Sequence, residues 1–421
     1  MRIFSLLATA LGLGLLPAAS LAQTALPLSS SGRWILDADG ARVKLRCINW
    51  AGHQETNLPE GLNKKSADYI ADFVAAQGFN CVRLTYSIDH ALAPDVGVGE
   101  AFTAAADAAG VSVEDMDGIY GDVVAQNAFA GEAGATVRGV WEQVVAALWK
   151  RGVTTILDNH VSKASWCCNI DDGNGWWDEG FGYNDANSRF FKTQNWLDGL
   201  QAMAEWSASQ PGVIGMGLRN EVREWLLQGT FNDRADWYSF MTQGAERVHG
   251  ANADLLVIMG GTQSATDLTH LRTVGTLDWT AWTGKHVWEW HAYDFTVTFA
   301  LAKGDCPLLK QTWGLFDGFV LEQGQDYTAP LILSEFGFGM TGGPDDGLTD
   351  DDKAYLDCLK EYVTGNDGEW ALWALEGSYY VREGTVNYDE GFGLMDFDWN
   401  GLRNPNVTAL LAPMLEVTQG P

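Results

Sequence analysis

The sequence predicts a single parallel (β/α)8 barrel of the TIM type, and three observations support this prediction. Short runs rich in Val, Ile and Leu recur along the chain, and each precedes a loop and a segment with apolar residues at helical spacing. Eight such runs are present, which is the number of strands in this barrel. The chain has 421 residues, a length that such barrels use as one domain with enlarged loops.

The expected strands are residues 43–49, 81–86, 153–160, 213–221, 255–260, 286–293, 330–336 and 370–375. Among the helices, residues 137–151 carry one apolar stripe that is expected to pack on the barrel. Thr349, followed by three Asp residues, is expected to cap another helix. Ser66 is expected to cap a third, which Gly78 ends.

Two connections are too long for ordinary βα loops: residues 87–136 after the second strand and residues 161–187 after the third. The second contains the adjacent pair Cys167 and Cys168. Loops that follow strands emerge on the barrel face that carries active sites. Both connections are therefore expected to border a substrate cleft.

The first 22 residues are typical of a signal peptide, with a charged start, an apolar stretch and small residues before a cleavage site after Ala22. The alternative is a membrane anchor, but the apolar stretch is shorter than the roughly 20 residues that a spanning helix needs. We therefore expect a secreted, extracellular protein with one catalytic domain over residues 23–421 and no membrane span.

The formal charge of −29, from 55 acidic and 26 basic residues, disfavours nucleic acids and anionic membranes as partners. No Gly-x-Ser-x-Gly, His-Glu-x-x-His or P-loop motif is present, and neither a metal nor a cofactor is expected. Most of the 19 tryptophans are expected in the core, and a few are expected along a cleft, where their rings would stack on sugars.

Six cysteines in an exported chain indicate disulfides. Cys47 with Cys81, on neighbouring strands, is the first expected pair, and Cys306 with Cys358 is the second.

Glu221 and Glu335 each stand at the end of an apolar segment that is predicted to be a strand. A charged residue is unexpected in such a segment unless it has a function. Either carboxylate alone would be read as a cap or a salt-bridge partner. Together they match the needs of a retaining glycosidase, in which one carboxyl group protonates the leaving oxygen and the other attacks the anomeric carbon. The sequence therefore predicts that Glu221 and Glu335 form the catalytic pair of such an enzyme.

With these motifs in this order, the chain resembles glycoside hydrolase family 5, the cellulase family, over residues 43–404. The family's functional positions fall on Arg83, His160, Asn220, Glu221, His291, Tyr293, Glu335 and Trp373. The resemblance implies Glu221 as acid/base and Glu335 as nucleophile. One departure is Val222, because the family's motif on the fourth strand commonly reads Asn-Glu-Pro. This departure leaves the chemistry unchanged and makes the substrate harder to assign.

The resemblance implies that Arg83, His160, Asn220, His291, Tyr293 and Trp373 bind or orient the substrate and the catalytic pair. Asn220 would bind the sugar 2-hydroxyl, and Trp373 would form the floor of a sugar site. Hydrogen bonds from Arg83 and Tyr293 are expected to lower the pKa of Glu335 below about 4.3. The charge on Glu335 is in turn expected to raise the pKa of Glu221.

The expected activity is retaining hydrolysis of β-1,4-glucosidic bonds in a polysaccharide or oligosaccharide by a monomer. Alternatives on the same catalytic pair are a β-mannanase, a β-1,3- or β-1,6-glucanase, and a glucosylceramide-type glycosidase. A barrel that binds carbohydrate without cleaving it is a more distant alternative.

Overall fold

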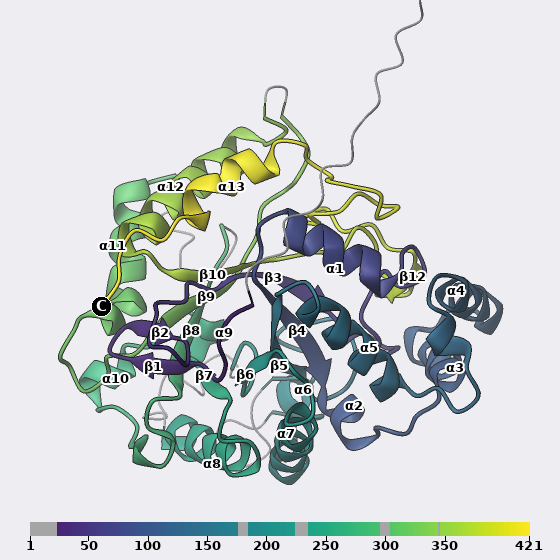
Figure 1. Cartoon of the computed structure of the whole chain (residues 1–421), viewed down its shortest axis with the longest axis horizontal. Coiled ribbons are helices and arrows are strands. Elements are labelled where there is room, and N and C mark those ends of the chain that lie inside the picture. Colours follow the sequence, from purple (N-terminus) through teal and green to yellow (C-terminus); the bar gives the residue numbers. More distant parts are fainter. Residues whose placement is uncertain (1–22, 176–183, 224–234, 295–303, 344–345) are drawn as a thin grey trace, which may run out of the picture.

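The computed structural model describes residues 23–175, 184–223, 235–294, 304–343 and 346–421. Parallel strands form a closed barrel in the hydrogen-bonded order β10-β3-β4-β5-β6-β7-β8-β9 (Figure 1). In chain order they are β3 (Arg46–Ala51), β4 (Cys81–Ser87), β5 (Thr154–Val161), β6 (Val213–Gly217), β7 (Leu256–Gly260), β8 (His286–Ala292), β9 (Leu331–Phe336) and β10 (Glu369–Leu372). The predicted (β/α)8 fold is confirmed. The predicted signal peptide, residues 1–22, lies outside the described residues.

Helices lie around the barrel (Figure 1). The longer ones between and after the strands are α1 (Ala67–Ala76), α5 (Val137–Trp149), α7 (Thr193–Ser207), α8 (Ala235–Ala251), α11 (Cys306–Phe316), α12 (Asp350–Asn366) and α13 (Val407–Leu415). Short elements are α6 (Asp185–Ser188), α9 (Thr262–Ala265), α10 (His270–Thr273), η3 (Thr280–Trp282), η5 (Gly318–Leu321), β11 (Val381–Arg382) and β12 (Thr385–Val386). No described helix is both long enough and apolar enough to span a membrane.

The predicted helix ends are confirmed by their capping contacts. The Thr349 side chain accepts a hydrogen bond from the backbone N–H of Asp352 at 3.1 Å, and α12 begins at the next residue. The Ser66 side chain accepts from Tyr69 at 3.2 Å. Gly78, with φ of 88°, follows the end of α1, in a backbone conformation that glycine adopts without strain.

One end of the barrel is closed by a hairpin of β1 (Ser29–Ser31) and β2 (Trp34–Leu36). Ile35 of this hairpin and Leu28 pack against apolar side chains from the barrel strands, which are Cys47, Cys81, Ile156, Ile214, Leu256, Ile258, Val287, Ile332 and Ala371. A larger core lies between the strands and the helices and contains most of the buried tryptophans, as expected. The opposite barrel end, where the strands terminate, is left for the site.

The long connection after β4 folds into helices of its own: α2 (Ile88–Leu92), α3 (Val98–Ala109), α4 (Val113–Gln126) and the turn η1 (Ala128–Gly131). In Figure 1, α3 and α4 stand together at the edge of the molecule. The connection after β5 carries a disulfide between the adjacent residues Cys167 and Cys168. Both predicted disulfides, Cys47–Cys81 and Cys306–Cys358, are also present.

Two strands end several residues earlier than the sequence predicts. β6 ends at Gly217 instead of Glu221, and β10 ends at Leu372 instead of residue 375. Glu221 has a positive φ of 43°, which is incompatible with a β-ladder. The chain still follows β5 up to this point, since the Asn220 N–H donates to the Asn159 carbonyl at 2.8 Å. Glu221 therefore lies on a turn just above the barrel.

Candidate active site

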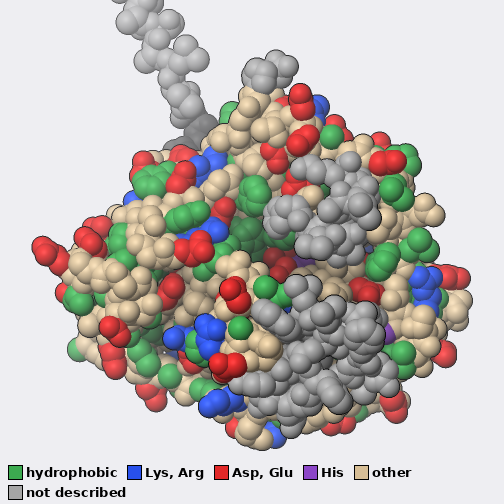
Figure 2. Space-filling view, turned by 180° about the vertical axis from the view of Figure 1, so that it is seen from behind, with side chains coloured by type: hydrophobic (Ala, Val, Ile, Leu, Met, Phe, Trp, Pro, Cys, Tyr) green, Lys and Arg blue, Asp and Glu red, His purple; other side chains and the backbone are tan. Residues whose placement is uncertain are grey.

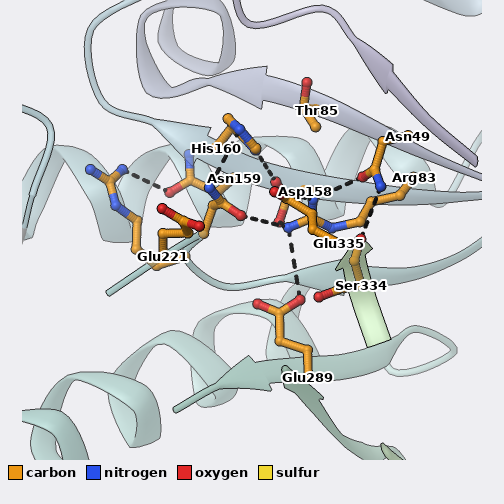
Figure 3. Close-up of polar contacts among 12 residues, drawn as sticks. Asn49, Arg83, Thr85, Asp158, Asn159, His160, Glu221, Glu289, Ser334 and Glu335 are labelled. Carbon is orange, nitrogen blue, oxygen red and sulfur yellow. Dashed lines mark hydrogen bonds and ion pairs between the residues drawn. The ribbon is translucent and has the colours of Figure 1, made fainter. Parts of the chain in front are cut away.

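Arg83, near the middle of β4, is the centre of a buried polar network inside the barrel (Figure 3). One guanidinium nitrogen, Nη1, donates to Glu335 Oε1 at 2.7 Å and to Asn49 Oδ1 at 2.9 Å. The other, Nη2, donates to Asn220 Oδ1 at 2.8 Å and lies 2.8 Å from Asp158 Oδ1. Arg83 thus fixes side chains from several strands relative to one another.

Glu335 lies on β9, is 5% exposed and is held by contacts to both carboxylate oxygens. Arg83 binds Oε1, and the Tyr293 hydroxyl donates to Oε2 at 3.2 Å. His291 Nδ1 lies 3.7 Å from Oε2. A carboxylate fixed at two oxygens cannot rotate freely, so one lone pair can be directed at a reacting carbon.

Glu221 lies opposite Glu335, and its side chain keeps 16% of its surface exposed. Its Oε1 lies 3.1 Å from His291 Nδ1, so His291 stands between the two carboxyl groups. One oxygen of Glu221, one oxygen of Glu335 and a ring nitrogen of His291 all lie within 4.8 Å of one another. Glu221 has no arginine bound to its carboxylate in the described part of the chain, which separates its surroundings from those of Glu335.

Burial favours the neutral form of both histidines, because it lowers the pKa of His160 and of His291. His160 Nδ1 lies 2.8 Å from Asp158 Oδ2. A neutral ring that donates from Nδ1 accepts at Nε2, and Asn220 Nδ2 lies 3.4 Å from that nitrogen. His160 therefore links Asp158 to Asn220.

An aromatic wall borders these polar groups. Trp373 follows β10, is 5% exposed and stacks on His160 with ring centroids 5.4 Å apart. Trp166, from the loop after β5, meets Trp373 edge-on at 6.3 Å. All of the predicted site residues are thus brought together at one end of the barrel, with Trp373 at their border.

Burial dominates the ionisation of the two carboxyl groups. It raises the pKa of Glu221 to about 7, although the charges of Arg223 and Arg83 oppose it. Burial also raises the pKa of Glu335, against the opposing effects of His291 and Arg83. The expectation that hydrogen bonds lower the pKa of Glu335 is therefore wrong, because desolvation outweighs them. Arg83 contacts only Glu335 of the pair, which favours the ionised form of Glu335 over that of Glu221.

Two groups of side chains have the spacing of metal ligands. His160 lies with Cys167 and Cys168, but the two sulfurs are joined in a disulfide and are not thiolates. Glu221, His291 and Glu335 form the second group. There Arg83 already provides a positive charge 2.7 Å from Glu335, so the charge of the Glu335 carboxylate is compensated by the chain itself.

Sequence reasoning missed three residues of this network: Asn49, Asp158 and Glu289. Glu289 on β8 lies 3.8 Å from Arg83 Nη2, and Asn49 donates to the Ser334 carbonyl at 2.9 Å. The signal was available, since each is a polar residue within an apolar strand. A barrel interior forces such side chains to pair with one another.

Comparisons with known proteins identify the family of the chain. The family model described as cellulase (glycosyl hydrolase family 5) matches residues 36–378. A glycosyl hydrolase 5 family protein of Chamaecyparis obtusa is 37% identical over 404 residues, covering 94% of this chain and 67% of the relative. The major extracellular endoglucanase of Xanthomonas campestris pv. campestris is 24% identical over 424 residues, covering 96% of this chain and 73% of the relative.

Solved structures show the same fold. The catalytic domain of the major endoglucanase from Xanthomonas campestris pv. campestris superposes with a TM-score of 0.69 at 20% identity, covering 92% of this chain and 99% of that chain. The family match extends from β2 to the segment after β10 and includes every residue of the candidate site. The chain therefore belongs to glycoside hydrolase family 5 and is a glycoside hydrolase.

Proposed function

We propose that the protein hydrolyses β-1,4-glucosidic bonds in a glucan with retention of configuration, with Glu335 as nucleophile and Glu221 as acid/base. The observation that carries this proposal is the spacing of the two carboxyl groups, which present oxygens within 4.8 Å of each other. Retaining enzymes need about 5 to 5.5 Å, whereas inverting enzymes need about 6.5 to 9.5 Å to admit a water molecule.

The different surroundings of the two groups support their separate roles. Glu335, oriented by Arg83 and Tyr293, attacks the anomeric carbon as a carboxylate. Glu221, with its pKa raised to about 7, keeps its proton below neutrality and gives it to the leaving oxygen. In the second step Glu221 takes a proton from water, which then releases the sugar from Glu335.

The substrate class rests on the named relatives. An endoglucanase of Paenibacillus polymyxa is 21% identical over 418 residues, and the Xanthomonas relative is also an endoglucanase. Enzymes that cleave a β-mannan, a β-1,3- or β-1,6-glucan or a glucosylceramide-type lipid can use the same catalytic pair, so these substrates remain alternatives.

Residues 1–22 support export of the protein. N-terminal sequencing of the secreted protein should therefore give Gln23 as the first residue, and a retained leader would contradict export.

Two variants test the catalytic pair on a panel of β-glucans, mannan and aryl cellobiosides. Glu335→Ala should reduce turnover to background, and Glu221→Ala should reduce it by about a thousandfold or more on substrates with poor leaving groups. Azide should rescue both variants, giving the α-glycosyl azide with Glu335→Ala and the β-glycosyl azide with Glu221→Ala. A 2-fluoro glycosyl inactivator should label Glu335 in the wild type.

Glu376→Gln is the matched control, because Glu376 is a buried glutamate after β10 that accepts from the Ala51 backbone and contacts neither carboxyl group of the pair. Its turnover should stay near that of the wild type. A label on another residue, or an inverted first product, would overturn the retaining mechanism. Binding of β-glucan without any release of reducing sugar would instead favour a non-catalytic barrel.

A further inference from the structure

The Cys167–Cys168 disulfide lies in contact with a residue of the candidate site. Asn220 Nδ2 lies 3.5 Å from Cys168 Sγ and 3.9 Å from Cys167 Sγ. Asn220 is 1% exposed, so its amide is shielded from water. None of the roles assigned above to the catalytic pair requires a disulfide at this place.

The loop that carries the disulfide is tied to the segment that carries Glu221. Arg223 binds both carboxylate oxygens of Asp172, at 2.9 and 2.8 Å, and also donates to the Glu221 carbonyl at 3.1 Å. Inside the loop, Asn174 Oδ1 accepts from the backbone N–H groups of Ser162 and Lys163. The sulfurs are therefore held at a fixed position relative to Glu221 and Asn220.

The residue before the disulfide is fixed as well. Trp166 packs against Trp373 and against Tyr379, with centroids 6.3 and 5.9 Å apart, and the Arg382 guanidinium lies 3.3 Å from its ring centroid. The disulfide thus continues the aromatic wall toward Asn220. This places the two sulfurs between the apolar border and the polar centre of the site.

The contacts of Asn220 define which way its amide faces. The oxygen accepts from Arg83 at 2.8 Å, and the nitrogen faces His160 Nε2 and the two sulfurs. A flipped amide would bring its nitrogen against a guanidinium and its oxygen against lone pairs on nitrogen and sulfur. Sulfur is a weak acceptor, so a sugar hydroxyl can take the same N–H donor from it at small cost.

We propose that the Cys167–Cys168 disulfide positions Asn220, holding its side-chain amide ready to donate to the sugar 2-hydroxyl while competing only weakly for that donor. Cys167 and Cys168 are positioning residues in this account, and the substrate class concerned is a β-glycoside with a free equatorial 2-hydroxyl. The inference rests on the proposed function, because it assigns the Asn220 amide to the sugar at the scissile bond.

The test compares two substrates: para-nitrophenyl β-cellobioside and its analogue lacking the 2-hydroxyl on the glucose next to the aryl group. The Cys167→Ala/Cys168→Ala variant should lose about 10- to 100-fold in kcat/KM on the parent, mainly through kcat, because the contact strengthens in the transition state. On the analogue the loss should stay within about threefold. Asn220→Ala should give the same pattern.

Cys306→Ala/Cys358→Ala is the matched control, since it removes a disulfide between α11 and α12 and should leave the ratio between the two substrates unchanged. Melting temperature and stoichiometric labelling by a 2-fluoro inactivator establish that each variant is folded. Should the Cys167→Ala/Cys168→Ala variant misfold, wild type reduced with dithiothreitol gives the same comparison, with mass mapping to identify the opened disulfide.

Equal losses on both substrates, or no loss on the parent, would overturn the role of the disulfide while leaving the proposed function intact. A wild type that is inactive on every β-glucoside would overturn the proposed function, and this inference with it. A loss confined to the parent substrate, shared with Asn220→Ala and absent from the control, supports the inference.

Discussion

Asp158 joins the two sides of the candidate site. Its carboxylate lies 2.8 Å from Arg83, which binds Glu335, and 2.8 Å from His160, which contacts Asn220 (Figure 3). It is fully buried, and its charge contributes to raising the pKa of both Glu221 and Glu335. A single buried carboxylate therefore contacts both Arg83 and His160 and favours the protonated forms of Glu221 and Glu335.

This arrangement predicts the pH dependence of kcat/KM. The wild type should show a bell, with an alkaline limb set by proton loss from Glu221, whose pKa is raised to about 7, and an acid limb set by protonation of Glu335. Asp158→Asn removes a negative charge that favours the protonated forms, so both limbs should move to lower pH. The maximal kcat/KM should also fall about 10- to 100-fold, because Arg83 and His160 lose their shared partner.

The control for this prediction is Asp367→Asn, which removes a buried carboxylate paired with Lys44 instead of with site residues. It should leave both limbs in place. If Asp158→Asn moved the two limbs of the pH profile to higher pH, or did not move them at all, Asp158 would not be a group that raises the pKa of Glu221 and Glu335.

At the level of the elements, α12 carries a prediction about stability. The side chain of Thr349 caps its first turn, while Tyr355, Leu356, Leu359 and Val363 are buried against the rest of the core. Thr349→Ala should reduce the free energy of unfolding by about 1 kcal/mol, since the Asp352 N–H loses its acceptor. Thr349→Ser keeps the oxygen and should restore the midpoint of urea unfolding. Equal midpoints for the Ala and Ser variants would contradict the capping role.

The elements also show what could be predicted from sequence. Hydrophobic runs predict the barrel strands, and capping residues predict the starts of α1 and α12, because both signals act over a few neighbouring residues. The site residues are predictable as a set because polar side chains at the ends of apolar strands must converge in a closed barrel. The sequence predicts Glu221 on a strand, but Glu221 lies on a turn with a positive φ. A positive φ is rare for residues other than glycine, so a glutamate gives no sequence signal for it.

Other features depend on contacts between distant segments. Arg223 and Asp172 lie in two loops and are 51 residues apart in the sequence. Neither loop has a sequence pattern that predicts this contact. The contact of Asn220 with the Cys167–Cys168 disulfide is of the same kind. The sign of the pKa shift of Glu335 was predicted wrongly because burial is a property of the whole fold, whereas hydrogen-bond donors can be guessed from motifs.

Over the whole molecule, acidic residues lie both on the surface and in the interior. The formal charge is −29, and acidic side chains are spread across the face in Figure 2. In the interior, burial raises the pKa of Glu369 to about 7 and the pKa of Glu376 to about 8. The folded state is therefore most stable when Glu369, Glu376 and Glu221 are protonated.

The sign of the resulting pH dependence follows from these shifts. A carboxyl group with a raised folded pKa contributes stability below its unfolded pKa of about 4.3, and this stability is lost as the pH rises through the folded value. Asp367 acts oppositely, because Lys44 and a backbone N–H lower its pKa despite burial, and its contribution is lost on acidification. The melting temperature should therefore be highest near pH 5 and should decrease toward pH 8.

Glu376→Gln tests this account, because glutamine keeps an oxygen for the Ala51 N–H but carries no charge. The variant should be more stable than the wild type by about 2 to 4 kcal/mol at pH 8 and equal to it near pH 4, since only the ionised carboxyl is penalised by burial. Glu114→Gln, which removes the same charge from an exposed position on α4, is the matched control and should give a small change that added salt abolishes. Urea unfolding followed at both pH values and at low and high salt separates the two effects. If Glu376→Gln and Glu114→Gln gave equal, salt-sensitive gains at pH 8, surface repulsion would account for the pH dependence and the buried carboxyl groups would not.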